Sequence, residues 1–274
     1  MDLNILQETP PWDWPPDAGS RVLKILIDAR ANASDRLIAA DLAGDFTVIN
    51  DELADTLMTI VRSPAEPEQL RAKAAISLGP VLEQAYTFDD EPDAVPITED
   101  TFHNIQEVLR KVYVDNKTPK EVRRRVLEAS VRAAESWHEN AIGAAYSSGD
   151  RDWILTAVFS MRWVRGFDDR ILEALKSTDT EIHFEAVQAA GNWGLAAAWS
   201  HVVALIHNVR TPKPLLLAAI EAVATIRPAE AREVLGDLLD SDDEEIAEAA
   251  SEAIDMADAE SDLEDDEEGD NELF

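Results

Sequence analysis

The chain has 274 residues, of which 46 % are apolar, so it can bury a sizeable core and is not disordered throughout. It contains no cysteine, which excludes disulfide bonds and thiolate metal sites. Its net charge of −32 argues against binding to nucleic acid or to an anionic membrane, since both would repel it at long range.

The N-terminus has neither the basic segment nor the apolar segment of a signal peptide. The longest apolar run, residues 195–206, is interrupted by Ser200 and His201 and is too short to cross a bilayer. We therefore expect a soluble cytoplasmic protein with no membrane partner.

Residues 1–19 form the first expected segment. The sequence PPWDWPP, residues 10–16, places four prolines around two tryptophans. Because proline fixes the backbone and lacks a donor, we expect an extended strap rather than a helix. The strap has two interpretations: a cover over the first helices, which hides the apolar end of a stack, or a docking motif for another protein.

A repeated pattern fills residues 20–256. An apolar anchor is followed by a small residue four and seven places later, as in Ile182, Ala186 and Ala189. The six anchors are Leu70, Val122, Trp153, Ile182, Leu215 and Ile246. Most anchors are about 30 residues apart, which is typical of stacked helix pairs. Small residues at these offsets share one helical face and let neighbouring helices approach closely.

Seven helix pairs are expected, the first a divergent copy that includes Asp35 to Gly44. An acidic insertion loop at 86–98 explains the one long interval between anchors. The first helices are expected at 20–27, 50–61, 99–114, 139–146, 168–175, 195–208 and 228–240. The second helices of the later pairs are expected to open at capping boxes or proline, at Thr118, Thr178, Thr211 and Ser241.

The segment RAKAAISLG, residues 71–79, resembles the second helix of HEAT repeats, and so do similar segments near Arg36 and at 186–191. The likeness is strongest to the short bacterial repeats related to phycobilisome lyases, and it covers about residues 20–257. It implies an all-α fold, a right-handed α-solenoid of about seven HEAT-like pairs. It is weak for function, because such repeats serve scaffolds, adaptors, chromophore lyases and a metal hydroxylase.

The sequence does not predict an enzyme. The HEAT-repeat hydroxylase among proteins with similar repeats looks recognisable by several His-Glu pairs. This chain has one such pair, His138 and Glu139, which we interpret as a polar surface feature. Phosphate-binding glycine motifs and nucleophile motifs are also missing from the sequence. We expect no catalytic residue, no cofactor and no metal.

Five of the seven tryptophans lie between residues 137 and 199 and overlap a mildly basic window, residues 110–170. Trp and Arg are enriched at interface hot spots. In HEAT-like pairs the second helices line the concave side, so the resemblance implies a partner-binding set off the alanine offsets. This set consists of Arg123, Arg124, Trp163, His183 and Trp193. The alternative is that the tryptophans fill space beside short helices.

The last segment, residues 257–274, has ten acidic residues in 18 and is expected to be disordered. It could serve solubility, capture a basic partner, or fold back on the basic middle of the chain. Taken together, the sequence predicts a scaffold or adaptor that binds an unidentified protein along its concave centre. The alternatives are a bilin-lyase-like chromophore handler and an acidic holder or mimic that captures basic partners through the tail.

Overall fold

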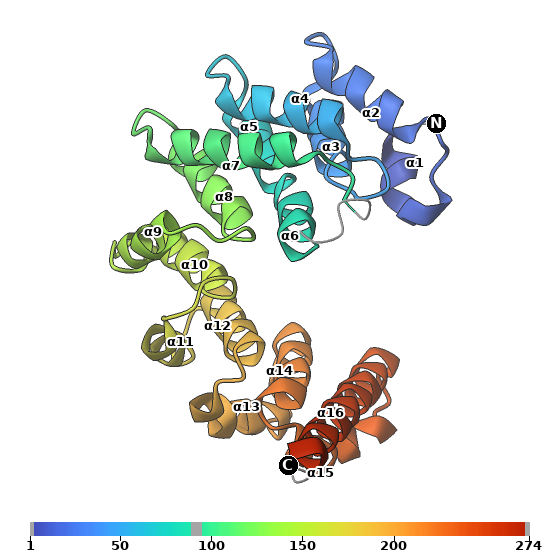
Figure 1. The fold of residues 1–274 in the computed structure, drawn as a ribbon, viewed down its shortest axis with the longest axis vertical. Coiled ribbons are helices and arrows are strands. Elements are labelled where there is room, and N and C mark those ends of the chain that lie inside the picture. Colours follow the sequence, from blue (N-terminus) through green and yellow to red (C-terminus); the bar gives the residue numbers. More distant parts are fainter. Residues whose placement is uncertain (1–2, 89–94, 272–274) are drawn as a thin grey trace. The chain divides into compact units, whose positions relative to one another are not determined.

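The computed structural model describes residues 3–88 and 95–271, with side chains up to residue 259. The described residues form α-helices and short 3-10 helices, with no strand among them. The chain divides into two compact units, residues 1–141 (unit 1) and residues 142–274 (unit 2), which are described separately below (Figure 1).

Unit 1 contains three helix pairs, α2 with α3, α4 with α5, and α7 with α8. The second helices α3, α5 and α8 pack side by side, and so do the first helices α2, α4 and α7 (Figure 1). Its elements are α1 (Leu3–Glu8), η1 (Pro11–Asp13), α2 (Ala18–Ile27), α3 (Ala33–Leu42), α4 (Asp51–Arg62), α5 (Glu68–Ile76), α6 (Gly79–Thr87), α7 (Glu99–Val114) and α8 (Lys120–Ser130).

Unit 2 repeats this arrangement, with α10, α12, α14 and α16 packed in chain order as second helices. Helix α9 (Trp137–Tyr146) contains the boundary between the units and precedes α10 in the chain, and α11, α13 and α15 pack on α12, α14 and α16 as their first helices. The other elements are α10 (Arg151–Ser160), α11 (Asp168–Ala174), α12 (Thr180–Asn192), η3 (Ala196–Ala198), α13 (Trp199–Ile206), α14 (Lys213–Ile226), η4 (Pro228–Glu230), α15 (Ala231–Leu235), η5 (Gly236–Asp240) and α16 (Glu244–Asn271). The expected all-α helical repeat is therefore confirmed for the described residues.

The small-residue stripe lies where the sequence pattern predicts it. In all six repeats the residues four and seven places after the anchor are buried, whereas the anchors Trp153 and Ile246 are half-buried. Where α12 meets α14, a Cβ on Gly191 would lie 2.9 Å from the Cα of Ala222. The stripe thus sets how closely the second helices can pack.

One arginine contact recurs in all three pairs of unit 1. The Nε atoms of Arg36, Arg71 and Arg123 donate to main-chain oxygens ten residues earlier, at 3.2, 3.0 and 2.8 Å. Each acceptor is the penultimate residue of the first helix: Leu26, Val61 and Tyr113. The arginine therefore satisfies a helix C-terminal carbonyl that has no intrahelical donor, and it links the two helices of one pair.

Ion pairs link neighbouring helix pairs in both units. In unit 1, Arg36 lies 2.7 Å from Glu66 and Lys73 lies 2.9 Å from Asp41. In unit 2 the linking ion pairs lie at the start of the second helices. Arg151 Nε lies 2.8 Å from Asp179 Oδ2, and its guanidinium also pairs with Glu181. Lys213 Nζ contacts Asp243 at 2.8 Å and Glu245 at 2.6 Å. In both cases the basic residue belongs to one pair and the two acids open the second helix of the next pair.

The N-terminal prediction is corrected in part. Residues 3–8 form helix α1, whose Leu3 and Leu6 are buried, and residues 11–13 form a 3-10 turn rather than an extended strand. The prolines do not prevent this, because α1 ends at Glu8, ahead of the proline-rich segment. Trp14 packs against the hydrophobic core, whereas Trp12 is 80 % exposed and covers little.

The later second helices begin close to the predicted positions, but the residues that cap them differ from the predicted ones. Asp179, not Thr178, accepts from the amides of Glu181 and Ile182. Pro119 and Pro212 precede α8 and α14 without a side-chain cap, and Asp243, not Ser241, accepts from the Glu245 amide. A carboxylate can take these positions because it accepts from two amides and also favours the positive end of the helix dipole.

Three other boundaries need comment. The second helix of the second pair is followed at once by another helix, so that α5 and α6 replace one continuous helix, because Pro80 would clash with a carbonyl in the latter. The insertion loop was expected to begin at Tyr86, but α6 continues to Thr87, and residues 89–94 lie outside the described part. The tail expected to be disordered from Ala257 belongs to helix α16 through Asn271; residues 272–274 are not described.

No helix among the described residues is long and apolar enough to cross a membrane.

Candidate functional site

The two predicted arginines of α8 lie in intramolecular contacts. Arg123 is half-buried, binds the Tyr113 carbonyl, and holds its guanidinium 5.3 Å from the centre of the Tyr113 ring. The side chain of Arg124 is 6 % exposed and contacts Glu121 at 2.7 Å and Glu128 at 3.8 Å. Arg124 is therefore buried, contrary to the surface position expected for it, and its contacts stabilise α8.

The predicted tryptophans lie together at the end of α10 and the end of α12. The indole of Trp193 donates to the carbonyl of Met161 at 2.7 Å, which fixes the turn after α10. Trp163 lies in that turn, half-buried, with the Arg162 guanidinium 5.7 Å from its ring centre. The structure therefore brings Trp163 and Trp193 together in unit 2, whereas Arg123 and Arg124 belong to unit 1.

Arg165 is a member of this cluster that the predicted set omitted. Its guanidinium lies 4.4 Å from the ring centre of Trp193, and the side chain is exposed. Arg162, by contrast, is half-buried and lies 3.5 Å from Glu185. Arg165 has no ion pair with any residue in the described part of the chain. A cation held over an aromatic face and open to solvent can bind an oxyanion in a fixed geometry.

The fifth predicted residue, His183, forms a pair with His201. The two Nε2 atoms are 2.7 Å apart, which links α12 to α13, and the rings meet edge to face. Burial lowers the pKa of both imidazoles, and His201 lowers that of His183 further. One ring must donate and the other accept, so the contact requires at least one imidazole to be neutral.

His138 is not the surface feature that its His-Glu sequence suggests. Its exposure is 0 %, its Nδ1 accepts from the Glu135 amide at 2.8 Å, and its Nε2 lies 3.0 Å from Ser130 Oγ. Burial lowers the pKa of His138 to about 4. These contacts fix the tautomer: Nδ1 accepts, so Nε2 carries the proton and donates to Ser130, whose hydroxyl donates to Leu127. His138 is thus a structural residue.

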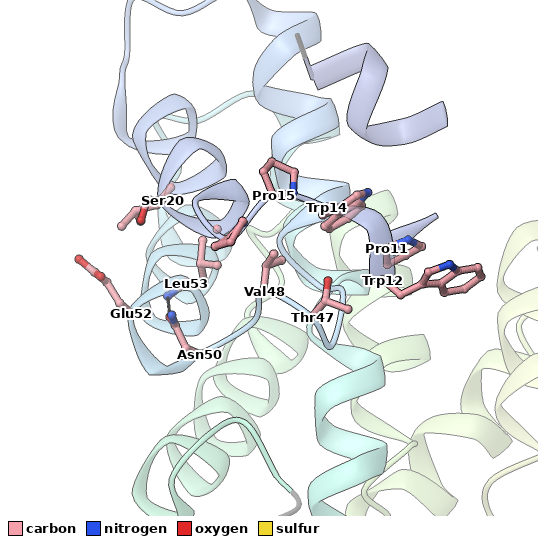
Figure 2. A pocket seen from close by; sticks show the side chains of 13 residues that line it. Pro11, Trp12, Trp14, Pro15, Ser20, Thr47, Val48, Asn50, Glu52 and Leu53 are labelled. Carbon is pink, nitrogen blue, oxygen red and sulfur yellow. Dashed lines mark hydrogen bonds between the residues drawn. The ribbon is translucent and has the colours of Figure 1, made fainter. Parts of the chain in front are cut away.

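A second candidate site lies in unit 1 beside the N-terminal turn. A pocket of about 400 Å³ opens between the segment Pro11–Pro16, the start of α2 and the start of α4 (Figure 2). Trp14 and Pro15 lie on one side of it and Val48 on the other, while Trp12 points outward at its end (Figure 2). The tryptophan cluster expected in the middle of the chain is half-buried, so the most exposed tryptophan of the described residues is Trp12.

Within the described residues, no group of three or more His, Cys, Asp or Glu side chains is arranged to hold a metal ion.

No protein-family model matches the chain, and no curated protein matches it either. Among solved structures, YibA of Escherichia coli is 17 % identical with a TM-score of 0.46, over 89 % of this chain and 84 % of that one. Human deoxyhypusine hydroxylase in complex with glycerol is 14 % identical with a TM-score of 0.40, over 88 % of this chain and 96 % of that one. These likenesses are distant, and the assignment of a helical repeat fold depends on the helix pairing described above.

Proposed function

We propose that this chain is a non-enzymatic, cytoplasmic scaffold or adaptor built from HEAT-like repeats, and that unit 2 binds a protein partner. The observation that carries the proposal is the exposed guanidinium of Arg165, stacked on Trp193 at 4.4 Å and without an ion pair among the described residues. Trp163 lies in the same segment, two residues before Arg165, and is half-buried. Arg and Trp are the residue types that most often dominate binding energy at interfaces.

The chemistry of the partner follows from the guanidinium. A planar guanidinium pairs best with a carboxylate through two parallel hydrogen bonds, and its stack on Trp193 pre-organises it for that geometry. The hydrogen bond from Trp193 to Met161 holds the stack in place, so little side-chain entropy is lost on binding. The unit 2 surface therefore suits an acidic side chain on the partner.

The test is quantitative affinity purification from the native host with the wild-type chain, Arg165→Glu and the matched control Arg210→Glu. Arg210 is also exposed and lies in a loop of unit 2, but it stacks on no aromatic ring among the described residues. We expect at least one protein to be retained by the wild type and the control and reduced about tenfold, or 1.4 kcal/mol, with Arg165→Glu. Identical sets for all three chains, with unchanged circular dichroism, would overturn the proposal.

A further inference from the structure

The N-terminal turn holds Trp12 in an exposed position with an ordered backbone behind it. The indole of Trp14 donates to the carbonyls of Leu6 and Thr9, at 3.0 and 2.8 Å. The amide of Asp13 bonds to Pro10, and that of Trp14 bonds to Pro11. Because Leu6 is fully buried in the core of unit 1, these bonds attach the turn to the core.

This anchoring restricts the backbone that carries Trp12. Flanking prolines limit the backbone of the turn, and rotation of the turn would break both indole bonds of Trp14. A rigid and exposed tryptophan loses little conformational entropy on binding, which is the property of an interface anchor. Trp12 is 80 % exposed and lies beside the pocket, so it adds contact area at the edge of that site.

The adjacent pocket defines what kind of group fits. Its lining is mixed: Trp14, Pro15 and Val48 contribute apolar groups, and Ser20, Thr47 and Asn50 contribute polar ones. Glu52 is the one charged side chain among the residues that line it. The Glu52 carboxylate is exposed and has no ion pair or hydrogen bond with another described residue. Figure 2 shows Glu52 and Trp12 at opposite ends of the row of lining side chains.

Charge complementarity selects the occupant. The first 20 residues contain four acidic residues and no basic residue. An acidic ligand is therefore repelled, and a second copy of this chain, with its net charge of −32, is repelled as well. A Lys or Arg side chain can pair with Glu52, while Pro15 and Val48 offer contacts to a neighbouring apolar side chain.

From this arrangement we infer that the pocket and Trp12 together bind a short extended segment of a partner protein, in which a basic residue lies close to apolar residues. The segment would place its basic side chain at Glu52, an apolar side chain between Pro15 and Val48, and a further residue against Trp12. This binding surface belongs to unit 1, so it is independent of the proposed role of Arg165 in unit 2, and either can fail without the other.

The test uses a phage-displayed library of random linear 12-residue peptides, selected on the full-length chain. Peptides that are enriched are synthesised, and their affinities are measured by fluorescence polarisation for the wild type, Trp12→Ala and Glu52→Lys. Matched controls are Val114→Ala, an exposed apolar residue, and Glu139→Lys, an exposed acid, both in unit 1. Circular dichroism melting curves verify that each variant is folded.

We expect the enriched peptides to combine a basic residue with apolar residues. Their affinity should fall at least tenfold with Trp12→Ala and with Glu52→Lys and stay within twofold in the controls. Selection on Glu52→Lys should enrich acidic peptides in place of basic ones. The inference is overturned if no peptide is enriched, if the enriched peptides bind the variants as well as the wild type, or if sedimentation shows self-association that Trp12→Ala abolishes.

Discussion

The buried imidazole of His138 makes one part of the folding stability depend on pH. With its pKa lowered to about 4, against about 6.5 in an unfolded chain, the folded state binds fewer protons between these values. Its contribution is therefore fully present above pH 6.5 and is lost as the pH falls toward 4. The full shift corresponds to about 3 kcal/mol.

We predict that the stability difference between the wild type and His138→Gln shrinks by about 3 kcal/mol from pH 7 to pH 4. Urea unfolding followed by circular dichroism measures the free energy of unfolding of both chains at each pH. The difference between the two chains cancels the titration of the many carboxylates that they share. His207→Gln, at an exposed position, serves as the control substitution. A difference for His138→Gln that does not change with pH would contradict this account.

Residue identity in the sequence did not separate buried from exposed polar side chains. Arg123 and Arg124 were predicted at a binding surface, but one binds a helix carbonyl and the other lies beside Glu128 in the interior. The signal that could have found the first was spacing, since Arg36, Arg71 and Arg123 each follow the end of a first helix. The exposure of Trp12 and Arg165 depends on tertiary packing, which no local pattern reports.

At the level of helices, the closest approach of α12 to α14 depends on Gly191. A methyl group there would lie 2.9 Å from both Cα and Cβ of Ala222, and the Thr225 hydroxyl bonds to the Gly191 carbonyl at 2.8 Å. We predict that Gly191→Ala destabilises the protein by roughly 1–3 kcal/mol, because overpacking outweighs the better helix propensity of alanine.

The matched control for this prediction is Gly236→Ala, since nothing lies within 4 Å of a Cβ built on Gly236 and its backbone is helical. That variant should be neutral or stabilised by up to about 1 kcal/mol. Chemical denaturation of the three chains under one condition measures both effects. If both glycine variants were equally stable, the packing explanation would be wrong.

The helices themselves were largely predictable. The stripe of small residues predicted where the second helices lie. Among the first helices, α7 begins and ends at the expected residues, Glu99 and Val114, with Thr98 as its cap. Errors arose where two local signals compete, as at Thr178 and Asp179, where either side chain could cap the helix. Helix α1 was not predicted, because the four prolines that follow it favour an extended backbone and the whole of residues 1–19 was expected to be extended.

For the molecule as a whole, the net charge of −32 dominates the response to salt. Exposed ion pairs such as those of Arg151 and Lys213 are each worth little, whereas repulsion among the excess acids opposes folding in both units. Salt at 0.5 M screens charges beyond a few ångström and relieves this repulsion.

We therefore predict that the melting temperature rises between 0.02 and 0.5 M NaCl. Scanning calorimetry measures it, and KCl should give the same rise, because screening depends on ionic strength and not on which monovalent cation is present. A melting temperature that falls with salt would mean that the ion pairs contribute more than the net repulsion costs.

The arginine-to-carbonyl contacts of unit 1 join two helices of the same pair, whereas the ion pairs of Arg151 and Lys213 join one pair to the next. In a chain of repeats, unfolding is governed by the intrinsic stability of each repeat and by the coupling between neighbours. The first kind of contact adds to intrinsic stability, and the second adds to coupling. Arg36 in unit 1 makes both kinds of contact, since it binds the carbonyl of Leu26 in its own pair and lies 2.7 Å from Glu66 of the next pair. One side chain there adds to the stability of its own pair and to the coupling with the neighbouring pair.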